Sequence, residues 1–504
     1  MPTNSPSEAA ETSVRPIIDW LSAAHGQTAV DNVAILRSHL HTLREAGLPP
    51  ARQLQLLDFL YDHSLKVVNA TLPDLHQFTL PVSRKLRQKI RGIQALLESI
   101  AQDYLCLLAG IFANNAESVR HPLELSAWRA VYCLHMHLLT SYLTTSPPGV
   151  GIWQSLHGAY LLAKQHDLAD QRIPRQELTL EQLYLSTVLL SCSQPASFSA
   201  LELDFVVEYI GRGVDGIRLD PEIPGGRQAL FWIDQSKDAP AHALARRVPP
   251  PESPILFFAC DDLAFLALDH LQQLERDYPP HQLDLPDFAG TPAGHGVLRR
   301  LAARWGSPAK RRFPRRRHSF RVSLCAGLEN IWQLLHRPDE AAAPTSEWMI
   351  TNESPDGCAM MHMAGNTETV HVGDLVAIRG EMKADAQPSP WNVCIVRWAL
   401  SENPEHIELG LQILAPTALP ALLSQINDAE DIPPQSSALL LPQVPPLRHT
   451  ESLVLPTGTL DQLGEKFALL LDQDKILLRE MHATAISEQT SSIEVFSVAT
   501  DERP

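Results

Sequence analysis

The hydrophobic pattern of the chain changes its period once, and this change constrains the fold more than any other feature. From about Pro16 to about Ile210 apolar residues recur with the spacing of amphipathic helices. The clearest stripe follows Pro81 and consists of Leu86, Ile90, Ile93, Leu97, Ile100, Tyr104 and Leu107. Residues 16–210 are therefore predicted to form a helical domain, either a bundle or an array of helix hairpins, behind a disordered leader at residues 1–15. The basic face from Arg84 to Arg91 lies off the stripe and is predicted to be solvated.

Beyond Gly211 the helical pattern weakens, and after residue 310 β patterns replace it. Ile407, Leu409, Leu411 and Ile413 alternate with period two, as in a half-buried strand. Several such short runs predict a small antiparallel β-barrel over residues 310–415. Residues 211–300 are predicted to be a mixed α/β segment that completes the N-terminal half, residues 416–450 a Pro-rich linker and residues 451–504 a β-rich tail. The expected fold class is α+β multidomain, a mostly helical N-terminal half followed by a barrel and a β-rich C-terminal extension.

Charge and cysteine usage indicate a cytoplasmic protein that does not bind nucleic acid over an extended surface. The chain holds 41 Lys and Arg against 58 Asp and Glu, a net charge of -17 that repels polyanions. The seven cysteines are scattered and never in C-x-x-C spacing, which favours reduced thiols. The segment Met1–Ser13 lacks the features of a secretory signal. The apolar run Tyr104–Ala113 is about half the length of a membrane span, so no span is expected.

A cluster of arginines precedes the predicted barrel. Between Arg304 and Arg321 there are eight Lys or Arg residues and no acidic ones. A guanidinium forms bidentate hydrogen bonds with phosphate or with the O6/N7 edge of guanine, and it stacks on bases. Pro314 disfavours a helix here, so the arginines are predicted to lie in an extended loop that leads into a strand at Phe320. A local basic site on an acidic body suits a small polyanion.

A polar turn follows about thirty residues later, with Asn352, Ser354 and Gly357 at its key positions. Asn and Ser supply short donors and acceptors at the end of a strand. Gly357 is expected to adopt the positive φ of a tight turn. Such a turn is placed to hold a base against the arginine loop.

Together these two features resemble the PilZ family, which carries R-x-x-x-R before the first barrel strand and (D/N)-x-S-x-x-G after it. Arg317 and Arg321 match the first motif, although Arg311/Arg315 and Arg312/Arg316 fit the same spacing. Asn352, Ser354 and Gly357 match the second motif, with Asn in place of the commoner Asp. The stretches VGDLVAIR, VRW and IELGLQIL resemble the later barrel strands, so the resemblance covers about residues 310–415.

The resemblance implies binding of cyclic-di-GMP, with no other cofactor, no metal and no catalysis. The residues it assigns to the ligand are Arg316, Arg317, Arg321, Asn352, Ser354 and Gly357, with Arg312 and Arg315 as secondary candidates. The arginines would engage phosphates and guanine edges, and Asn352 and Ser354 would contact a base.

Two other motifs carry less weight. Gly211–Gly216 spells G-x-G-x-x-G, but no helix is predicted after it to bind a pyrophosphate. His135 and His137 are two residues apart and diverge on a helix, so His135 is interpreted as a satisfied core histidine and not as a metal ligand.

The leading hypothesis is a bacterial cyclic-di-GMP receptor that transmits ligand binding to a protein partner through its helical half. The partner is unknown, and components of motility, pilus or polysaccharide machinery all fit. One alternative is a protein-interaction scaffold whose PilZ-like barrel has lost the ligand. The other is a nucleic-acid-binding protein that uses the arginine run. No set of acid, base and nucleophile supports an enzyme.

Overall fold

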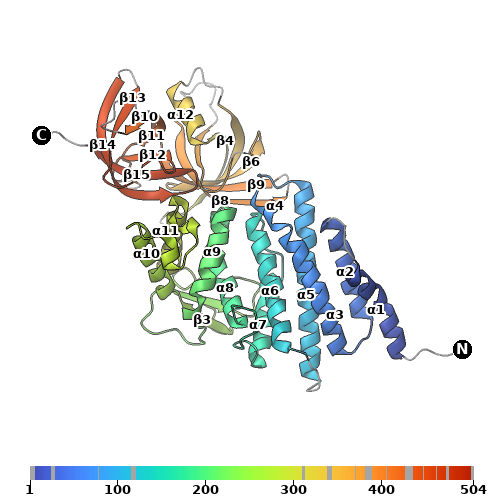
Figure 1. Cartoon of the computed structure of the whole chain (residues 1–504). Helices are drawn as coiled ribbons and strands as arrows, with labels where there is room; N and C mark the ends of the chain where they lie inside the picture. Colours follow the sequence, from blue (N-terminus) through green and yellow to red (C-terminus); the bar gives the residue numbers. More distant parts are fainter. Residues whose placement is uncertain are drawn as a thin grey trace.

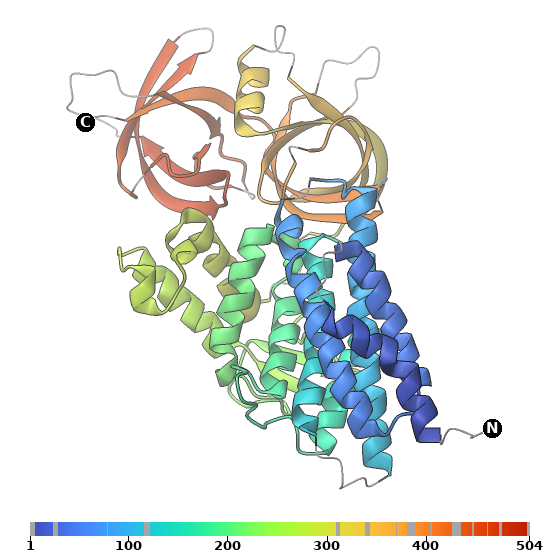
Figure 2. The same cartoon turned by 45° about the vertical axis from the view of Figure 1, so that its right-hand side comes forward.

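The computed structural model describes residues 6–23, 29–77, 79–114, 121–308, 313–337, 343–368, 370–380, 389–403, 406–425, 435–445, 448–460, 462–472 and 476–500. A helical half carries two β-barrels side by side at one end (Figures 1 and 2). This arrangement confirms the predicted fold class.

The N-terminal half is built from long helices that run side by side beneath the barrels in Figure 1. In chain order they are α1 (Pro6–Ser22), α2 (Ala29–Glu45), α3 (Pro50–Asn69), α4 (Leu72–His76), α5 (Arg84–Ala113), α6 (Leu123–Leu143), α7 (Ile152–Gln165), α8 (Leu180–Cys192) and α9 (Ala200–Gly213). The disordered leader was wrong from Pro6 onward, because this segment is the first part of an amphipathic helix whose Val14 and Ile17 are fully buried.

Helix starts follow local sequence signals. Thr179 and Ser199 begin α8 and α9 with capping boxes. In each box the hydroxyl of the cap residue accepts from the backbone N–H of the third helical residue, whose side chain accepts from the backbone N–H of the cap residue. α9 then ends at Gly213 and is followed by a short 3-10 turn, so the G-x-G-x-x-G sequence closes a helix and opens none.

α5 is the only helix in the described part of the chain that is long and apolar enough to cross a membrane. Its predicted stripe is buried from Ile90 to Tyr104 and packs mainly on α6, with α2 and α3 beside it. The core of the bundle therefore accounts for its apolar character.

The mixed segment completes the same core. It holds a three-stranded sheet and two helices, namely β1 (Leu230–Asp234), β2 (His242–Ala243), β3 (Ile255–Ala259), α10 (Asp261–Leu274) and α11 (Pro292–Gly306). One continuous cluster of buried apolar side chains extends from Val14 to Trp305. The helices and this segment are thus a single packed unit.

The first barrel closes in the strand order β4-β5-β6-β9-β8-β7. Its elements are β4 (Arg316–Ala326), α12 (Leu328–His336), β5 (Thr345–Ser354), β6 (Gly357–Ala364), β7 (Leu375–Gly380), β8 (Asn392–Asn403) and β9 (His406–Ala415). Trp348, Met360 and Leu409 are fully buried inside it.

The second barrel closes in the order β10-β11-β12-β15-β14-β13, which repeats the topology of the first barrel strand for strand. Its strands are β10 (Leu419–Gln425), β11 (Gln435–Leu441), β12 (Ser452–Pro456), β13 (Lys466–Asp472), β14 (Ile476–Gln489) and β15 (Ile493–Thr500). The Pro-rich linker expected over residues 416–450 was wrong, because this stretch supplies β10 and β11. Pro420 is tolerated as the second residue of its strand, where a missing amide proton costs little.

α12 joins the two barrels. Its Ile331 and Leu334 lie in one apolar cluster with Val393 of the first barrel and Leu439 of the second. Trp332 Nε1 also donates to the carbonyl of Ala421 at 2.8 Å. The outer faces of both barrels are thereby packed against each other.

Two of the contacts by which the helical half docks on the first barrel come from the region where α5 begins. Leu80, which precedes α5, is 5% exposed and belongs to the apolar cluster inside the barrel. Arg87 was expected to be solvated, but it is buried, because its guanidinium donates to Ser401 Oγ at 2.8 Å and to the Glu402 carbonyl at 3.1 Å. Periodicity placed Arg87 correctly off the stripe but gave no sign that the barrel covers that face.

Buried histidines make the stability of the helical half dependent on pH. His135 lies 2.9 Å from Thr187 Oγ1, and burial lowers the pKa of both His135 and His137 to about 4. Between pH 6.5 and 4 the unfolded chain binds protons that the folded chain does not, so the free energy of unfolding falls as the pH falls. We expect a loss of roughly 2 kcal/mol per histidine between pH 7 and pH 5.

Urea denaturation of the wild type and of His135→Gln at both pH values measures this effect. The variant lacks one titrating group, so it should lose less stability on acidification. An equal loss in both proteins would contradict the assignment to His135.

Candidate functional site

The arginines lie on the first strand of the first barrel and just before it. β4 begins at Arg316, four residues earlier than the strand start expected at Phe320. Arg315, Arg316, Arg317 and Arg321 are all exposed. None of these four makes a hydrogen bond or ion pair with the residues that the structure describes. Arg312 lies outside the described residues.

Strand register brings Arg317 and Asn352 together. Arg317 lies opposite Asn352 on β5, and the row of opposed residues continues through Ala359, Gly410 and Trp398. The adjacent row, with Cys358, Leu411 and Val396, points into the barrel interior. Because side chains alternate along strands, the row from Arg317 to Trp398 lies on the outer face.

Arg321 shares this outer face. It lies opposite Met349, and its neighbour Val322 is buried in the interior. Arg316 instead lies opposite Glu353, one of the residues at the mouth of the barrel. Of the R-x-x-x-R registers, Arg317/Arg321 thus places both guanidinium groups on the same face as Asn352.

The polar turn between β5 and β6 holds two different kinds of group. The Asn352 Oδ1 atom is buried and has no hydrogen-bond partner among the described residues. The Ser354 hydroxyl lies 2.6 Å from Asp356 Oδ1 and 3.0 Å from the Gly357 carbonyl, so its proton is used within the hairpin. Asn352 is therefore the residue of this turn with an unused polar atom, whereas Ser354 mainly shapes the turn.

Gly357 is required for a reason different from the expected one. It does not have a positive φ. A Cβ at this position would instead lie 2.3 Å from the Leu411 carbonyl oxygen on β9. The expectation of a left-handed turn was wrong, because the constraint is a close approach of two strands.

The mouth of the barrel contains only a small cavity. It measures about 80 Å³ and is lined in part by Phe320, Glu353 and Ser354. Burial raises the pKa of the neighbouring Cys358 thiol to about 12, so this thiol stays protonated and unreactive. A nucleotide-sized ligand would therefore lie on the open outer face and not inside the barrel.

Two further residues of the outer face were not singled out from the sequence. The Trp398 ring lies against Gly410, where a Cβ would come within 1.8 Å of Nε1. Gln412 lies directly opposite Gly357 in the register of β6 and β9. The stretch VRW contains Trp398, but only strand pairing shows that it faces the same side as the motif.

The described residues contain no group of three His, Cys, Asp or Glu side chains that could hold a metal ion. All seven cysteines fall within the described parts and are free thiols.

Comparison with known families agrees with this geometry. Residues 332–420 match the family model described as "Cyclic-di-GMP receptor FimW, middle PilZ domain". This match includes Asn352, Ser354 and Gly357 and begins after the arginines. Because the match runs from α12 through the last strand of the β4–β9 barrel, we call this barrel the PilZ barrel.

The resemblance extends to the helical half, since residues 15–222 match the model "Cyclic-di-GMP receptor FimW, N-terminal domain". Over 87% of its length the chain is similar to the cyclic-di-GMP receptor FimW of Pseudomonas aeruginosa, with 21% identity and 83% of that relative covered. Apart from the first two residues of β10, the second barrel lies beyond both family-model matches.

Gly357→Ala is expected to destabilise the PilZ barrel by about 1–3 kcal/mol, the usual cost of overpacking, because the new methyl group meets the Leu411 carbonyl. Chemical denaturation measures the change. Gly211→Ala is the matched control, since Gly211 lies within α9 and a Cβ there meets nothing within 4 Å. The control should be neutral or stabilising. Equal stability of Gly357→Ala and wild type would refute the packing argument.

Proposed function

We propose that this protein is a cytoplasmic cyclic-di-GMP receptor that binds the ligand on the outer face of its PilZ barrel and acts without catalysis. The binding residues are Arg316, Arg317, Arg321, Asn352, Ser354 and Gly357, with Arg315 and Arg312 as secondary contacts. The relative FimW carries this function in its name.

The observation that carries the proposal is the pairing of Arg317 with Asn352 in strand register. Exposed guanidinium groups that make no hydrogen bond or ion pair with a described residue are available for phosphates and guanine edges. The unpaired Asn352 Oδ1 can accept from a base N–H, which would relieve the cost of a buried, unsatisfied acceptor. Ser354 keeps lone pairs that can accept from the ligand, and Gly357 keeps β6 close to β9.

β8 offers a route from the ligand to the helical half. Its first residue, Asn392, lines the mouth cavity beside Ser354, and near its other end Ser401 binds Arg87 of α5. The ligand can change how the helical half docks on the PilZ barrel only if it binds one docking arrangement more tightly than the other. The helical half then presents or withdraws a surface for a protein partner, in motility, pilus or polysaccharide machinery.

Arg317→Ala/Arg321→Ala should weaken cyclic-di-GMP binding at least about tenfold, because each lost charged hydrogen bond is worth about 1.5–3 kcal/mol. Isothermal titration calorimetry measures the change, and thermal melting checks that the fold is intact. Arg276→Ala is the control, because Arg276 is equally exposed but lies after α10. If the double variant bound the ligand as tightly as the wild type, these arginines would not form the binding site. If the wild type gave no heat of binding, the alternative of a ligand-free interaction scaffold would be supported instead.

Arg87→Met tests the relay. The substitution keeps the length of the side chain but removes its hydrogen bonds to Ser401 and Glu402. Cyclic-di-GMP should still bind, while hydrogen exchange at the start of α5 should no longer respond to the ligand. A ligand response equal to that of the wild type would argue against relay through this contact.

A further inference from the structure

A cavity lies where the helical half meets the outer face of the PilZ barrel. Its helical wall consists of Tyr142 near the end of α6, residues 145–148 in the loop that follows, residues 194–197 between α8 and α9, and Arg304 of α11. Its barrel wall consists of Arg397, Trp398, Leu400 and Gln412. We call it the junction cavity. Its volume of about 580 Å³ falls within the range of ligand sites, about 300–1,000 Å³.

Arg304 brings an unbalanced positive charge to this cavity. Its guanidinium stacks on Phe198 at 4.8 Å and donates to the Ser193 carbonyl. No carboxylate in the described part of the chain lies within ion-pair distance of it. Burial, together with repulsion from Arg300 and Arg397, lowers its pKa to about 9. A packed cation of this kind is stabilised by an anion.

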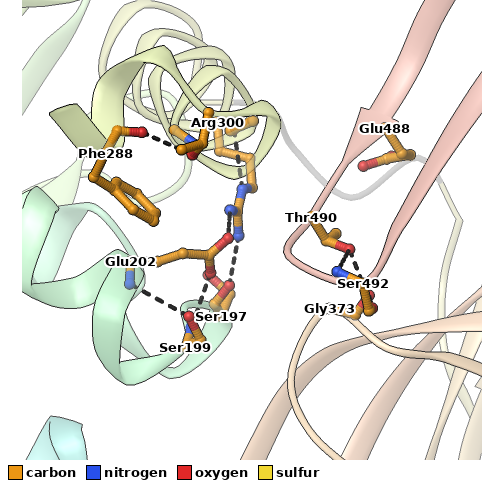
Figure 3. Close-up of polar contacts among 12 residues, drawn as sticks. Ser197, Ser199, Glu202, Phe288, Arg300, Gly373, Glu488, Thr490 and Ser492 are labelled. Atoms are coloured by element: carbon orange, nitrogen blue, oxygen red, sulfur yellow. Dashed lines mark hydrogen bonds and ion pairs between the residues drawn. The ribbon is translucent and has the colours of Figure 1, made fainter. Parts of the chain in front are cut away.

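The neighbouring arginines are already neutralised. Arg300 pairs with Glu202 and donates to the Ser197 carbonyl at 2.9 Å, as Figure 3 shows on the helical side of the junction. Arg397 pairs with Glu488 of the second barrel, which Figure 3 places on the facing side. The charge available for a ligand therefore belongs to Arg304.

A second polar group in the cavity also lacks a partner. Thr145 Oγ1 is buried without a hydrogen bond to any described residue. The backbone of Thr145 has a φ of 48°, which is strained for a β-branched residue, and Gln194 in the same wall has a φ of 57°. Strain of this kind is retained where the surroundings enforce it, often at ligand sites.

The remaining walls suit a flat, apolar ring. Pro147, Pro148 and Pro195 line the helical side, and the half-buried Trp398 lines the barrel side. Stacking of a base on an aromatic side chain is worth about 1–3 kcal/mol. The cavity thus combines a guanidinium that has no carboxylate partner among the described residues, a hydroxyl without a described hydrogen bond, and a surface for stacking.

We propose that the junction cavity is a second ligand site that takes a purine nucleotide, with a phosphate on Arg304 and the base beside Trp398. It is separate from the arginine motif but close to it, because Gln412 lies opposite Gly357 in the sheet. The nucleotide is either a second molecule of cyclic-di-GMP or a mononucleotide. Occupancy joins α11, the α6–α7 loop and the PilZ barrel, so it stabilises one docking arrangement.

Calorimetry with cyclic-di-GMP and, separately, with 5′-GMP tests the site in the full chain that carries Arg317→Ala/Arg321→Ala. At least one probe should still bind, and Arg304→Met added to this background should weaken it at least about tenfold. Arg304→Lys should recover part of the affinity. Binding of cyclic-di-GMP alone identifies a second dinucleotide as the occupant, and binding of 5′-GMP identifies a mononucleotide.

Thr145→Val is a second test in case Arg304→Met impairs folding. It keeps the shape and branching of the side chain and removes only the hydroxyl, which has no described hydrogen-bond partner. It should leave the melting temperature equal or higher and weaken the same probe. The proposal is overturned if the arginine-motif variant binds neither probe at millimolar concentration, or if Arg304→Met and Thr145→Val leave binding unchanged.

Failure of the receptor proposal gives a different pattern. In that case Arg317→Ala/Arg321→Ala would not alter cyclic-di-GMP affinity, whereas Arg304→Met would still reduce nucleotide binding.

Discussion

The Arg397 guanidinium joins the two barrels at the place where both face α11 of the helical half. From β8 of the PilZ barrel it donates to Gln412 on β9 at 2.7 Å and to Glu488 on β14 of the second barrel at 2.9 Å. A planar group with several donors can satisfy two partners at once, which an ammonium does less well. Glu488 also lies beside α11, where Arg299 donates to the next residue, Gln489. The geometry of the junction cavity therefore depends on this ion pair.

The two barrels share one topology but not one chemistry. Both close with the same strand order, yet the segment before β10, Pro416–Ala418, contains no arginine. In the second barrel the outer face packs against α12, and the tip of the β14–β15 hairpin contacts the PilZ barrel and α11. Ser492 Oγ in that tip lies 3.4 Å from the Gly373 carbonyl of the PilZ barrel. We therefore propose that the repeated fold serves ligand binding in one copy, whereas the other copy supports the arrangement of domains.

The proposed ligand surface and the docking contacts occupy different ends of the same strands. The arginines and the Asn352 turn lie at one end of the barrel, and Leu80 and Arg87 engage the other end. A closed barrel is stiff, because each strand is bonded on both sides. A change at one end is accordingly expected to reach the other end through the displacement of a whole strand. β8 is the candidate strand, because it contacts both the mouth cavity and the docking site of Arg87.

The sequence by itself determined the order of the helical and β regions, the central stripe of α5 and the two motifs, because these depend on local periodicity and on residue type. The choice of arginine also indicated a ligand with phosphate groups or guanine edges, because a guanidinium forms bidentate hydrogen bonds with both. Only the tertiary structure decided that β10 and β11 belong to a second barrel, since proline content does not report strand pairing. The role of Gly357, the burial of Arg87 and the placement of Trp398 beside the motif likewise come from segments far apart in the chain. Such contacts leave no periodic signal, because each depends on where a distant backbone lies.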